Sequence, residues 1–351
     1  MKIRLAIAVL VAVAAYPNAA YASYAAHAAF SQQDTVPRVG EYRVFTGSGD
    51  PASLDAIITA MAAKEAVFIG ESHDDLTGHH LELELLSRAF KAYGLEGSTA
   101  RPVTLSLEMF ERDVQYVVNE YLQDQITEDQ FRKSGRPWPE YETDYRPMIE
   151  FAKEQGLAVV AANAPRRYAN RVTRLGREAL LDLSPQAQAS LPPLPYGMPS
   201  ALYREQFQMA MVEAMQEMRD RCPIPPAMAR AMNPDSAPAA MPMRSHAMES
   251  DPLNAQALWD ASMAYSISEH LMQKPDALVL HMVGSFHVER GTGTPEHLAR
   301  YRPGTSTMIV VIRPAENIEL FDAERDGENE DFVILTDEAL TRPPPPCPGG
   351  D

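Results

Sequence analysis

The stretches VFIGESHDD (67–75) and LVLHMVGSFHVERG (278–291) decide the fold that we expect for this chain. Each stretch is an apolar run that stops at a glycine. Three residues after that glycine stands a histidine, His73 in the first stretch and His287 in the second. Glycine lets the backbone turn sharply and approach a ligand closely. If both runs are strands of one sheet, the two imidazoles meet at one site.

Strand and helix signals alternate around these two stretches. Two segments have the apolar periodicity of helices, GHHLELELLSRAFKAYG (78–94) and ERDVQYVVNEYL (111–122). Short apolar runs typical of buried strands lie at 65–70, 102–108, 156–163, 276–284 and 307–312. Runs that are apolar almost throughout are buried on both faces, and their alternation with helices is typical of parallel sheets. We therefore expect an α/β fold with an open, mostly parallel sheet and flanking helices.

The α/β domain is expected over residues 41–322, after an alanine-rich linker at 23–40. The alternation of strand and helix signals is interrupted between about 180 and 256, where proline and methionine are frequent, as in LPPLPYGMP and CPIPP. We interpret this segment as an inserted helical or irregular subdomain carried on the sheet. The proline-rich tail, 340–351, is of low complexity and is expected to be disordered.

Residues 1–22 have the pattern of a secretory signal peptide. Lys2 and Arg4 form a positive start, residues 5–15 are apolar, and the small residues that end at Ala22 form a cleavage site. The apolar run is shorter than the roughly 20 residues that span a bilayer. No lipobox cysteine follows it. We expect an exported protein of the bacterial periplasm, without a lipid anchor.

Composition narrows the range of functions. The chain has 351 residues, of which 45% are hydrophobic, so it is long enough for a large core. A net charge of −17 makes sequence-independent binding to nucleic acid unfavourable. The two cysteines, Cys222 and Cys347, are too few for a four-cysteine zinc site, and whether they pair is left open.

Polar side chains stand at the carboxyl ends of the expected strands, which is the edge where open parallel sheets bind ligands. Glu71 and His73 follow the first strand, Glu108 ends the second, Asn163 ends the third, and His287 follows the fourth. Two histidines and one or two glutamates are enough for a metal site or for general-base chemistry. One hypothesis is therefore a hydrolase that binds a divalent metal through His73, His287 and Glu108, with Glu71 and Glu108 as catalytic carboxylates.

Three further residues belong to the region of the fourth strand. His281 lies inside that strand and is expected in the core. Trp259 is at helical spacing with Met263 and Ile267 and is also interpreted as a core residue. Asp260 either orients a group of the site or lies on the helix surface.

Five blocks of the sequence resemble, in kind and in order, the ChaN-like haem-binding proteins. The blocks are FIGESHDDLTGHHLELELL, LSLEMFERDVQ, YRPMIEFAKEQGLAVVAANAPRRYANRV, ALWDASMAYSI and HMVGSFHVERGTGTPEHL, and they cover about residues 55–312. The resemblance implies an exported bacterial protein of haem or iron uptake, with an α/β core and an appended helical part. It also implies a homodimer that holds a stacked pair of haems between its subunits, with an outer-membrane haem receptor as a partner. The missing lipobox cysteine and the methionine- and proline-rich insertion depart from the family pattern.

For the site, the resemblance implies iron coordination by tyrosine and histidine. Haem needs an apolar slot, an axial ligand and cations for its propionates. Arg166 and Arg167 closely follow the third strand and are expected to face the propionates. The side chains expected at the iron are His73, His287, Tyr145 and Tyr168, with Tyr141 as a further candidate.

The wider superfamily keeps the hydrolase hypothesis open. The Tiki and TraB proteins and the erythromycin esterases are similar in having G-x-x-H motifs with glutamates. Tiki-type members are metal-dependent proteases, and the esterases are hydrolases that use a histidine base. The positions that match this hydrolytic pattern are Gly70, His73, Glu108, Gly284 and His287. The paired histidines therefore line a haem pocket or form a hydrolytic centre.

The methionine-rich insertion carries a third, weaker hypothesis. Met211, Met215 and Met218 share one helix face, which suits a haem plane or a partner subunit. Soft ligands for copper(I) are offered by Met241, Met243, His246 and Met248. Adaptable packing in a methionine-rich segment is the favoured interpretation.

Overall fold

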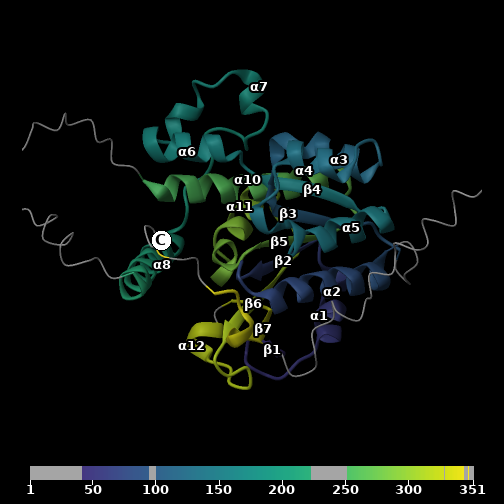
Figure 1. Cartoon of the computed structure of the whole chain (residues 1–351), viewed down its shortest axis with the longest axis vertical. Coiled ribbons are helices and arrows are strands. Elements are labelled where there is room, and N and C mark those ends of the chain that lie inside the picture. The colour runs from purple at the N-terminus through teal and green to yellow at the C-terminus, as the bar shows by residue number, and fades with distance from the viewer. Residues whose placement is uncertain (1–41, 95–99, 223–250, 328, 344–346, 348–351) are drawn as a thin grey trace, which may run out of the picture. The chain divides into compact units, whose positions relative to one another are not determined.

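A computed structural model describes residues 42–94, 100–222, 251–327, 329–343 and 347 (Figure 1). The predicted signal peptide (1–22) and linker (23–40) lie outside the described residues. Within the described part of the chain, no helix is both long and apolar enough to cross a membrane.

Within these described ranges, seven strands form one sheet. They are β1 (Tyr42–Thr46), β2 (Ala66–Glu71), β3 (Val103–Glu111), β4 (Ala158–Asn163), β5 (Leu278–Gly284), β6 (Thr307–Ala315) and β7 (Phe332–Asp337). The longer helices are α1 (Leu54–Ala60), α2 (Leu76–Tyr93), α3 (Gln115–Leu122), α4 (Glu128–Gly135), α5 (Arg146–Gln155), α6 (Arg166–Leu175), α8 (Ala201–Arg221), α10 (Pro252–Gln273) and α11 (Thr294–Tyr301). Two shorter helices are α7 (Pro185–Gln188) and α12 (Ala323–Asp326).

The strand order is β1-β7-β6-β2-β5-β3-β4, and neighbouring strands are parallel except β1, which is antiparallel to β7. The predicted open, mostly parallel sheet is therefore confirmed, and the predicted strands correspond to β2 through β6. β2 and β5 are neighbours, with Glu71 opposite Gly284. The two strands that end in G-x-x-H thus deliver their histidines to the same edge of the sheet.

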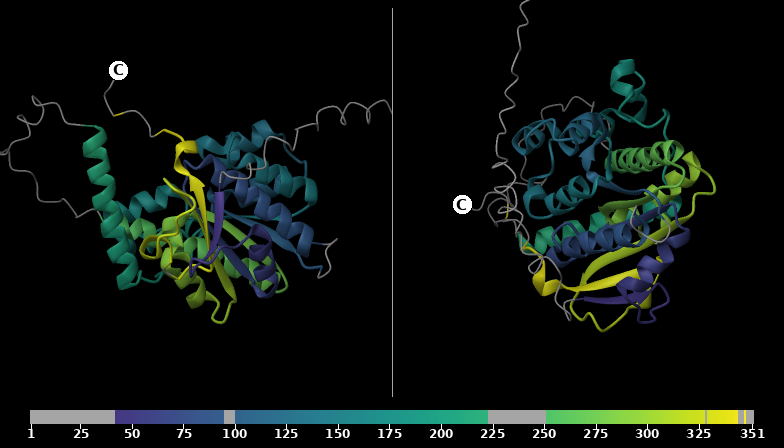
Figure 2. Two further views of the ribbon diagram at one scale, coloured as in Figure 1. Left: turned by 90° about the horizontal axis from the view of Figure 1, so that it is seen from below. Right: turned by 90° about the vertical axis from the view of Figure 1, so that its right-hand side faces the viewer.

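Helices cover both faces of the sheet (Figure 1 and Figure 2). On one face, Val67 and Ile69 of β2 belong to a core shared with α1 through α5. On the other face, Phe68 packs in a core with Met263 and Ile267 of α10 and with α11. Successive side chains of a strand point to opposite faces, so a strand covered on both sides is apolar throughout. This explains why the strands have continuous apolar sequences.

The sheet continues past residue 322, where the sequence predicts the end of the domain. β7 lies between β6 and β1, and neither β1 nor β7 is predicted from the sequence. Val333 and Leu335 of β7 form a small core with Phe45 of β1 and Ala315 of β6. These two strands therefore belong to the same domain as the other five.

The predicted insertion, about 180–256, is described in part. Its first section includes α7, and Leu180, Leu191 and Tyr196 pack with α6 and α10. α8 follows, and after it Cys222 forms a disulfide with Cys347. The residues of the copper hypothesis, Met241, Met243, His246 and Met248, lie outside the described residues. Most residues of the tail predicted to be disordered, 340–351, lie outside them as well.

Candidate functional site

The loops after β2 and β5 touch each other because each strand has a glycine at or near its end. A Cβ atom on Gly70 would lie 2.9 Å from Cγ2 of Val288 and 3.0 Å from Cα of Ser285 in the opposite loop. A Cβ atom on Gly284 would lie 3.0 Å from Cε1 of His73. All three distances are too short for an ordinary carbon contact. The repeated glycine is thus required by the close approach of the two loops.

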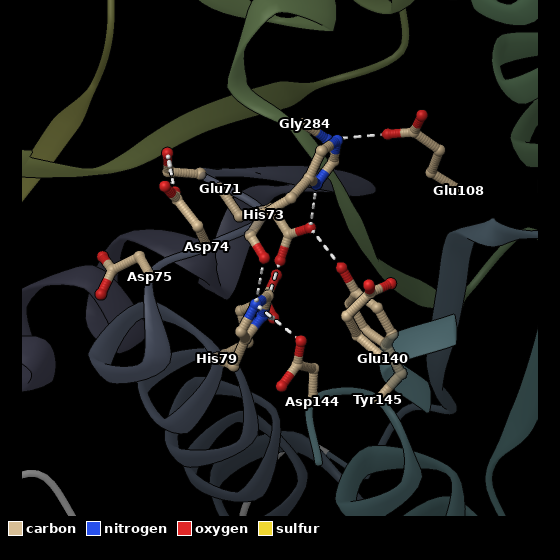
Figure 3. Close-up of polar contacts among 12 residues, drawn as sticks. Glu71, His73, Asp74, Asp75, His79, Glu108, Glu140, Asp144, Tyr145 and Gly284 are labelled. Atoms are coloured by element: carbon tan, nitrogen blue, oxygen red, sulfur yellow. Dashed lines mark hydrogen bonds and ion pairs between the residues drawn. The ribbon is translucent and has the colours of Figure 1, made fainter. Parts of the chain in front are cut away.

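His73 is held in place by Glu71 (Figure 3). Its Nδ1–H donates to Oε1 of Glu71 (2.7 Å), and the hydroxyl of Tyr145 donates to the same oxygen (2.9 Å). Glu71 is buried, whereas the His73 side chain is 49% exposed. Burial alone lowers the pKa of His73, but the Glu71 carboxylate outweighs it and raises the pKa. Nε2 of His73 makes no hydrogen bond to any described residue, so it is available to a ligand.

His287 is buried between two carboxylates. Its Nδ1–H donates to Oδ1 of Asp260 (2.8 Å), and its Nε2 lies 3.7 Å from Oε1 of Glu108. Oε2 of Glu108 accepts the backbone N–H of Gly284 (2.8 Å), as Figure 3 shows. Burial lowers the pKa of His287, but Asp260 and Glu108 outweigh it and raise the pKa to about 9. At neutral pH this part of the site is therefore an imidazolium between two carboxylates.

A cavity of about 490 Å³ opens beside the two histidines. This volume is within the range of small-molecule and cofactor pockets. The cavity is lined by His73, Glu108, Trp138, Asn163, Arg166, Ala169, Asn170, Thr173, Ala255, Gln256, Trp259 and His287. The Trp138 ring stands edge-on to the His73 ring, with 5.0 Å between the ring centres. Two indoles and several small side chains thus face two imidazoles across one cavity.

The two arginines predicted at the site have different surroundings. Arg166 lines the cavity, and its guanidinium lies 5.2 Å from the centre of the Trp138 ring. Arg167 forms an ion pair with Asp113 (2.6 Å) and is not among the residues that line the cavity. The structure therefore brings only the first of the two arginines to the histidines.

The predicted tyrosines do not line the cavity. Tyr145 is buried, and burial together with the Glu71 carboxylate raises the pKa of its hydroxyl, which stays protonated. Tyr168 is partly buried and packs with the core between α6 and α10. Tyr141 is buried in a cluster of aromatic rings that includes Phe131.

The predictions made near β5 have three different outcomes. His281 is confirmed as a core residue, because it is fully buried and forms a hydrogen bond with Oγ of Ser106 (2.9 Å). Trp259 packs against the core but is only partly buried, and it forms a wall of the cavity. Asp260 is buried and orients His287, so the alternative of a helix-surface position is wrong.

Trp138 is a residue of the cavity that sequence reasoning missed. It lies between two prolines in the irregular stretch RPWPEY, where no periodic pattern gives it a place. One signal was present, because the chain contains only two tryptophans. Both of them, Trp138 and Trp259, line the cavity.

The residues of the cavity fit a haem group. A porphyrin requires flat apolar contacts, which Trp138 and Trp259 offer. It requires an axial ligand, and His73 has a free Nε2. Metal-binding histidines usually donate their other N–H to a carboxylate or a carbonyl, as His73 does to Glu71. Arg166 adds a cation for a propionate group.

Comparison with known structures supports this fold. A solved structure described as "Cofacial heme binding to ChaN of Campylobacter jejuni" superimposes with a TM-score of 0.56 at 13% identity, covering 85% of this chain and 97% of that chain. The type III effector HopBA1 gives a TM-score of 0.42 at 11% identity, covering 81% of this chain and 93% of its own. A Bacillus cereus protein gives 0.43 at 10% identity, covering 82% and 92%. These last two similarities are too low to carry an argument.

Comparison of sequences identifies the family. No curated protein matches the chain. Residues 57–298 match the family model described as haem-binding uptake, Tiki superfamily, ChaN. The match runs from α1 to α11 and includes both G-x-x-H motifs and every residue that lines the cavity. The chain therefore belongs to the haem-binding uptake family of ChaN, within the Tiki superfamily.

Proposed function

We propose that this protein binds haem in the cavity between Trp138 and Trp259, where Nε2 of His73 would hold the iron. The observation that carries the proposal is the state of the His73 ring. Its Nδ1–H is donated to the buried Glu71, which selects the tautomer whose Nε2 can bind a metal. Membership of the haem-binding uptake family supports haem as the ligand. When bound, haem would supply an iron centre for this nitrogen to hold.

Charged residues of the cavity orient the bound group in this proposal. Arg166 pairs with a propionate, because its guanidinium lies at the cavity beside Trp138. His287 is a positively charged contact of the bound group, held in place by Asp260. Tyr145 acts through Glu71: its hydroxyl fixes the carboxylate that orients His73.

Titration of the haem-free protein with haemin tests the proposal. We expect a saturable shift of the Soret band, and haemin binding weakened by about tenfold or more in His73→Gln. His270→Gln is the matched control, because His270 forms a hydrogen bond with Thr104 and does not line the cavity. Unchanged haemin affinity in His73→Gln would contradict the assignment of the ligand. A wild-type protein without any saturable Soret shift would contradict haem binding itself.

Arg166 and Arg167 offer a second matched pair. Arg166→Gln is expected to weaken haemin binding, because it removes the propionate partner. Arg167→Gln removes a neighbouring guanidinium that is already engaged by Asp113 and is expected to leave the affinity unchanged. Equal effects of the two substitutions would argue against a specific propionate contact.

We further propose that the protein is exported to the periplasm and works there in haem or iron uptake, as a homodimer that exchanges haem with an outer-membrane receptor. The signal-peptide pattern of residues 1–22 supports export. Exposed apolar side chains of α8 support a dimer surface; they are Met209, Val212, Met215 and Met218.

The hydrolase and copper hypotheses stay predictions. Ester or peptide turnover that depends on added divalent metal would support the hydrolase.

A further inference from the structure

A second group of ionisable side chains gathers around the other oxygen of Glu71, and none of its members lines the cavity. It consists of Glu71 from β2 and of His79 and Glu82 from α2, and all three side chains are buried. His79 and Glu82 stand at positions i and i+3 of α2, so they share one face of that helix. This inference does not rest on the proposed haem function, because the haem proposal uses Oε1 of Glu71 and its contacts with His73 and Tyr145, whereas the cluster uses Oε2.

The potential ligand atoms of the three residues converge. Nδ1 of His79 lies 2.9 Å from Oε2 of Glu71 and 3.2 Å from Oε2 of Glu82. One ligand atom from each residue lies within 4.8 Å of the others. Adjacent ligands that are each about 2.1 Å from an octahedral ion are about 3.0 Å apart. The two separations at Nδ1 of His79 therefore match those between neighbouring ligands of a metal ion.

The contact of Nε2 of His79 indicates that Nδ1 is the ring nitrogen available to bind a metal. Nε2 lies 3.2 Å from the carbonyl oxygen of His73. A carbonyl only accepts hydrogen bonds, so this nitrogen carries a hydrogen. In the neutral ring Nδ1 is then a hydrogen-bond acceptor, and it faces two carboxylates, which also only accept. A proton or a metal cation between these acceptors is therefore required. Metal-binding histidines have this same outer contact with a carbonyl or carboxylate.

The charge around the cluster supports the same conclusion. Asp75 and Asp144 are buried close to His79, which brings the number of buried carboxylates to four. Arg342 compensates one of them through its contact with Asp144. Oε1 of Glu82, which is fully buried, has no hydrogen-bond partner among the described residues. Burial of carboxylates is unfavourable unless cations or hydrogen bonds compensate them.

We propose that Glu71, His79 and Glu82 bind a divalent first-row transition-metal ion. One imidazole nitrogen and two carboxylate oxygens suit Zn²⁺, Mn²⁺, Fe²⁺ or Co²⁺. The competing arrangement has protons in place of the ion. In it, His79 is charged, because Glu71 and Glu82 outweigh burial and raise its pKa to about 11. Glu82 is protonated there, because burial and the Glu71 charge raise its pKa well above the usual range.

The metal-bound arrangement requires a carboxylate at position 82, whereas in the protonated arrangement Glu82 is neutral. Co²⁺ titration distinguishes the two arrangements. The probe is added to the full chain, freed of haem and treated with a chelator, and its visible d–d absorption reports binding. We expect one Co²⁺ per chain, bound more than about 100-fold more weakly in Glu82→Gln. Glu84→Gln, on the same helix but paired with Arg88, is the matched control. Glu108→Gln reports on the cavity, and both controls are expected to keep Co²⁺ binding.

Three results would overturn the proposal. They are the absence of stoichiometric Co²⁺ binding, full binding in Glu82→Gln, and a loss of binding in Glu108→Gln, which would place the ion at the cavity. Circular dichroism checks that each variant is folded. If Glu82→Gln does not fold, Glu82→Asp takes its place, since it keeps the charge but withdraws the ligand by one methylene. Weaker Co²⁺ binding is expected there, and unchanged binding would count against the site.

Discussion

Asp260 is the residue on which the charge of His287 depends. Its Oδ1 accepts the Nδ1–H of His287 (2.8 Å) and the hydroxyl hydrogen of Thr294 (3.0 Å). The pKa of His287 in the folded protein, about 9, lies above the ordinary value for histidine, about 6.5. The folded state therefore binds this proton more tightly than the unfolded state. The resulting stabilisation is complete below pH 6.5 and is lost as the pH rises through 9.

Asp260→Asn is expected to remove most of this stabilisation, because of the two carboxylates that outweigh burial at His287 it removes the one that also accepts the Nδ1–H hydrogen bond. The free energy of unfolding of the wild type should fall between pH 6.5 and 9 more steeply than that of the variant, by up to about 1.4 kcal/mol per pH unit. Denaturant unfolding across this pH range measures the difference. Glu269→Gln, on the same helix but paired with Arg112, is the control. Equal slopes for the wild type and Asp260→Asn would contradict the assignment.

At this scale the sequence predicts the residues whose spacing has a structural cause. His73 and His287 were predicted because each follows a glycine that the contact between the loops requires. Glu82 was not considered, although it lies on the buried face of α2 between Leu81 and Leu85. An acidic residue on the apolar face of a predicted helix contradicts the amphipathic pattern. That contradiction is the signal that could have led to the buried cluster.

At the scale of elements, β2 through β6 were predictable from the sequence, and β1 and β7 were not. β2 through β6 are covered on both faces or nearly so, and their continuous apolar runs are typical of such strands. β1 has only two buried residues in the sequence YRVFT, so its pattern is weak. β7 is buried, but it follows an acidic segment and lies beyond the predicted end of the domain. Its place depends on pairing with β6 and β1, which local patterns do not encode.

The two ends of α8 are restrained by different interactions. Near its start Tyr203 is fully buried, with 5.0 Å between its ring centre and that of Phe286. Most residues from Gln208 onward are exposed. Beyond the end of the helix, Cys222 is linked to Cys347 by the disulfide. The second half of α8 therefore depends on the disulfide more than on packing.

Cys222→Ser is expected to loosen the second half of α8 and to leave the sheet unchanged. Backbone amides of 210–221 should exchange with deuterium about tenfold faster or more, because few buried contacts oppose local opening. Amides of β5 serve as the internal reference. Hydrogen exchange with mass spectrometry, in oxidised wild type and variant, measures the effect. Equal exchange along α8 in the two proteins would show that the disulfide does not restrain this helix.

At the scale of the whole molecule, the cavity is a product of strand order. Its residues come from the loops after β2 and α4, from β3 and β4, from α6 and α10, and from the segment after β5. They meet because β5 lies between β2 and β3 in the sheet, although it follows both by more than a hundred residues. The sequence predicts the strand ends but not their order. The sequence therefore predicts polar groups at one edge of the sheet. It does not show that Arg166 lines the cavity and that Arg167 does not.

Dimer formation driven by haemin is the prediction that belongs to this scale. α8 exposes Met215 (53%) and Met218 (47%) on one face, and exposed apolar patches of this kind mark interaction surfaces. We expect haemin to raise the sedimentation coefficient of the wild type, and the double variant Met215→Gln, Met218→Gln to stay monomeric while it keeps its Soret shift. Met272→Gln is the control, since Met272 is equally exposed (58%) but lies near the end of α10. A double variant that sediments like the haemin-loaded wild type would exclude α8 as the dimer surface. A wild type that stays monomeric with a full Soret shift would exclude the dimer.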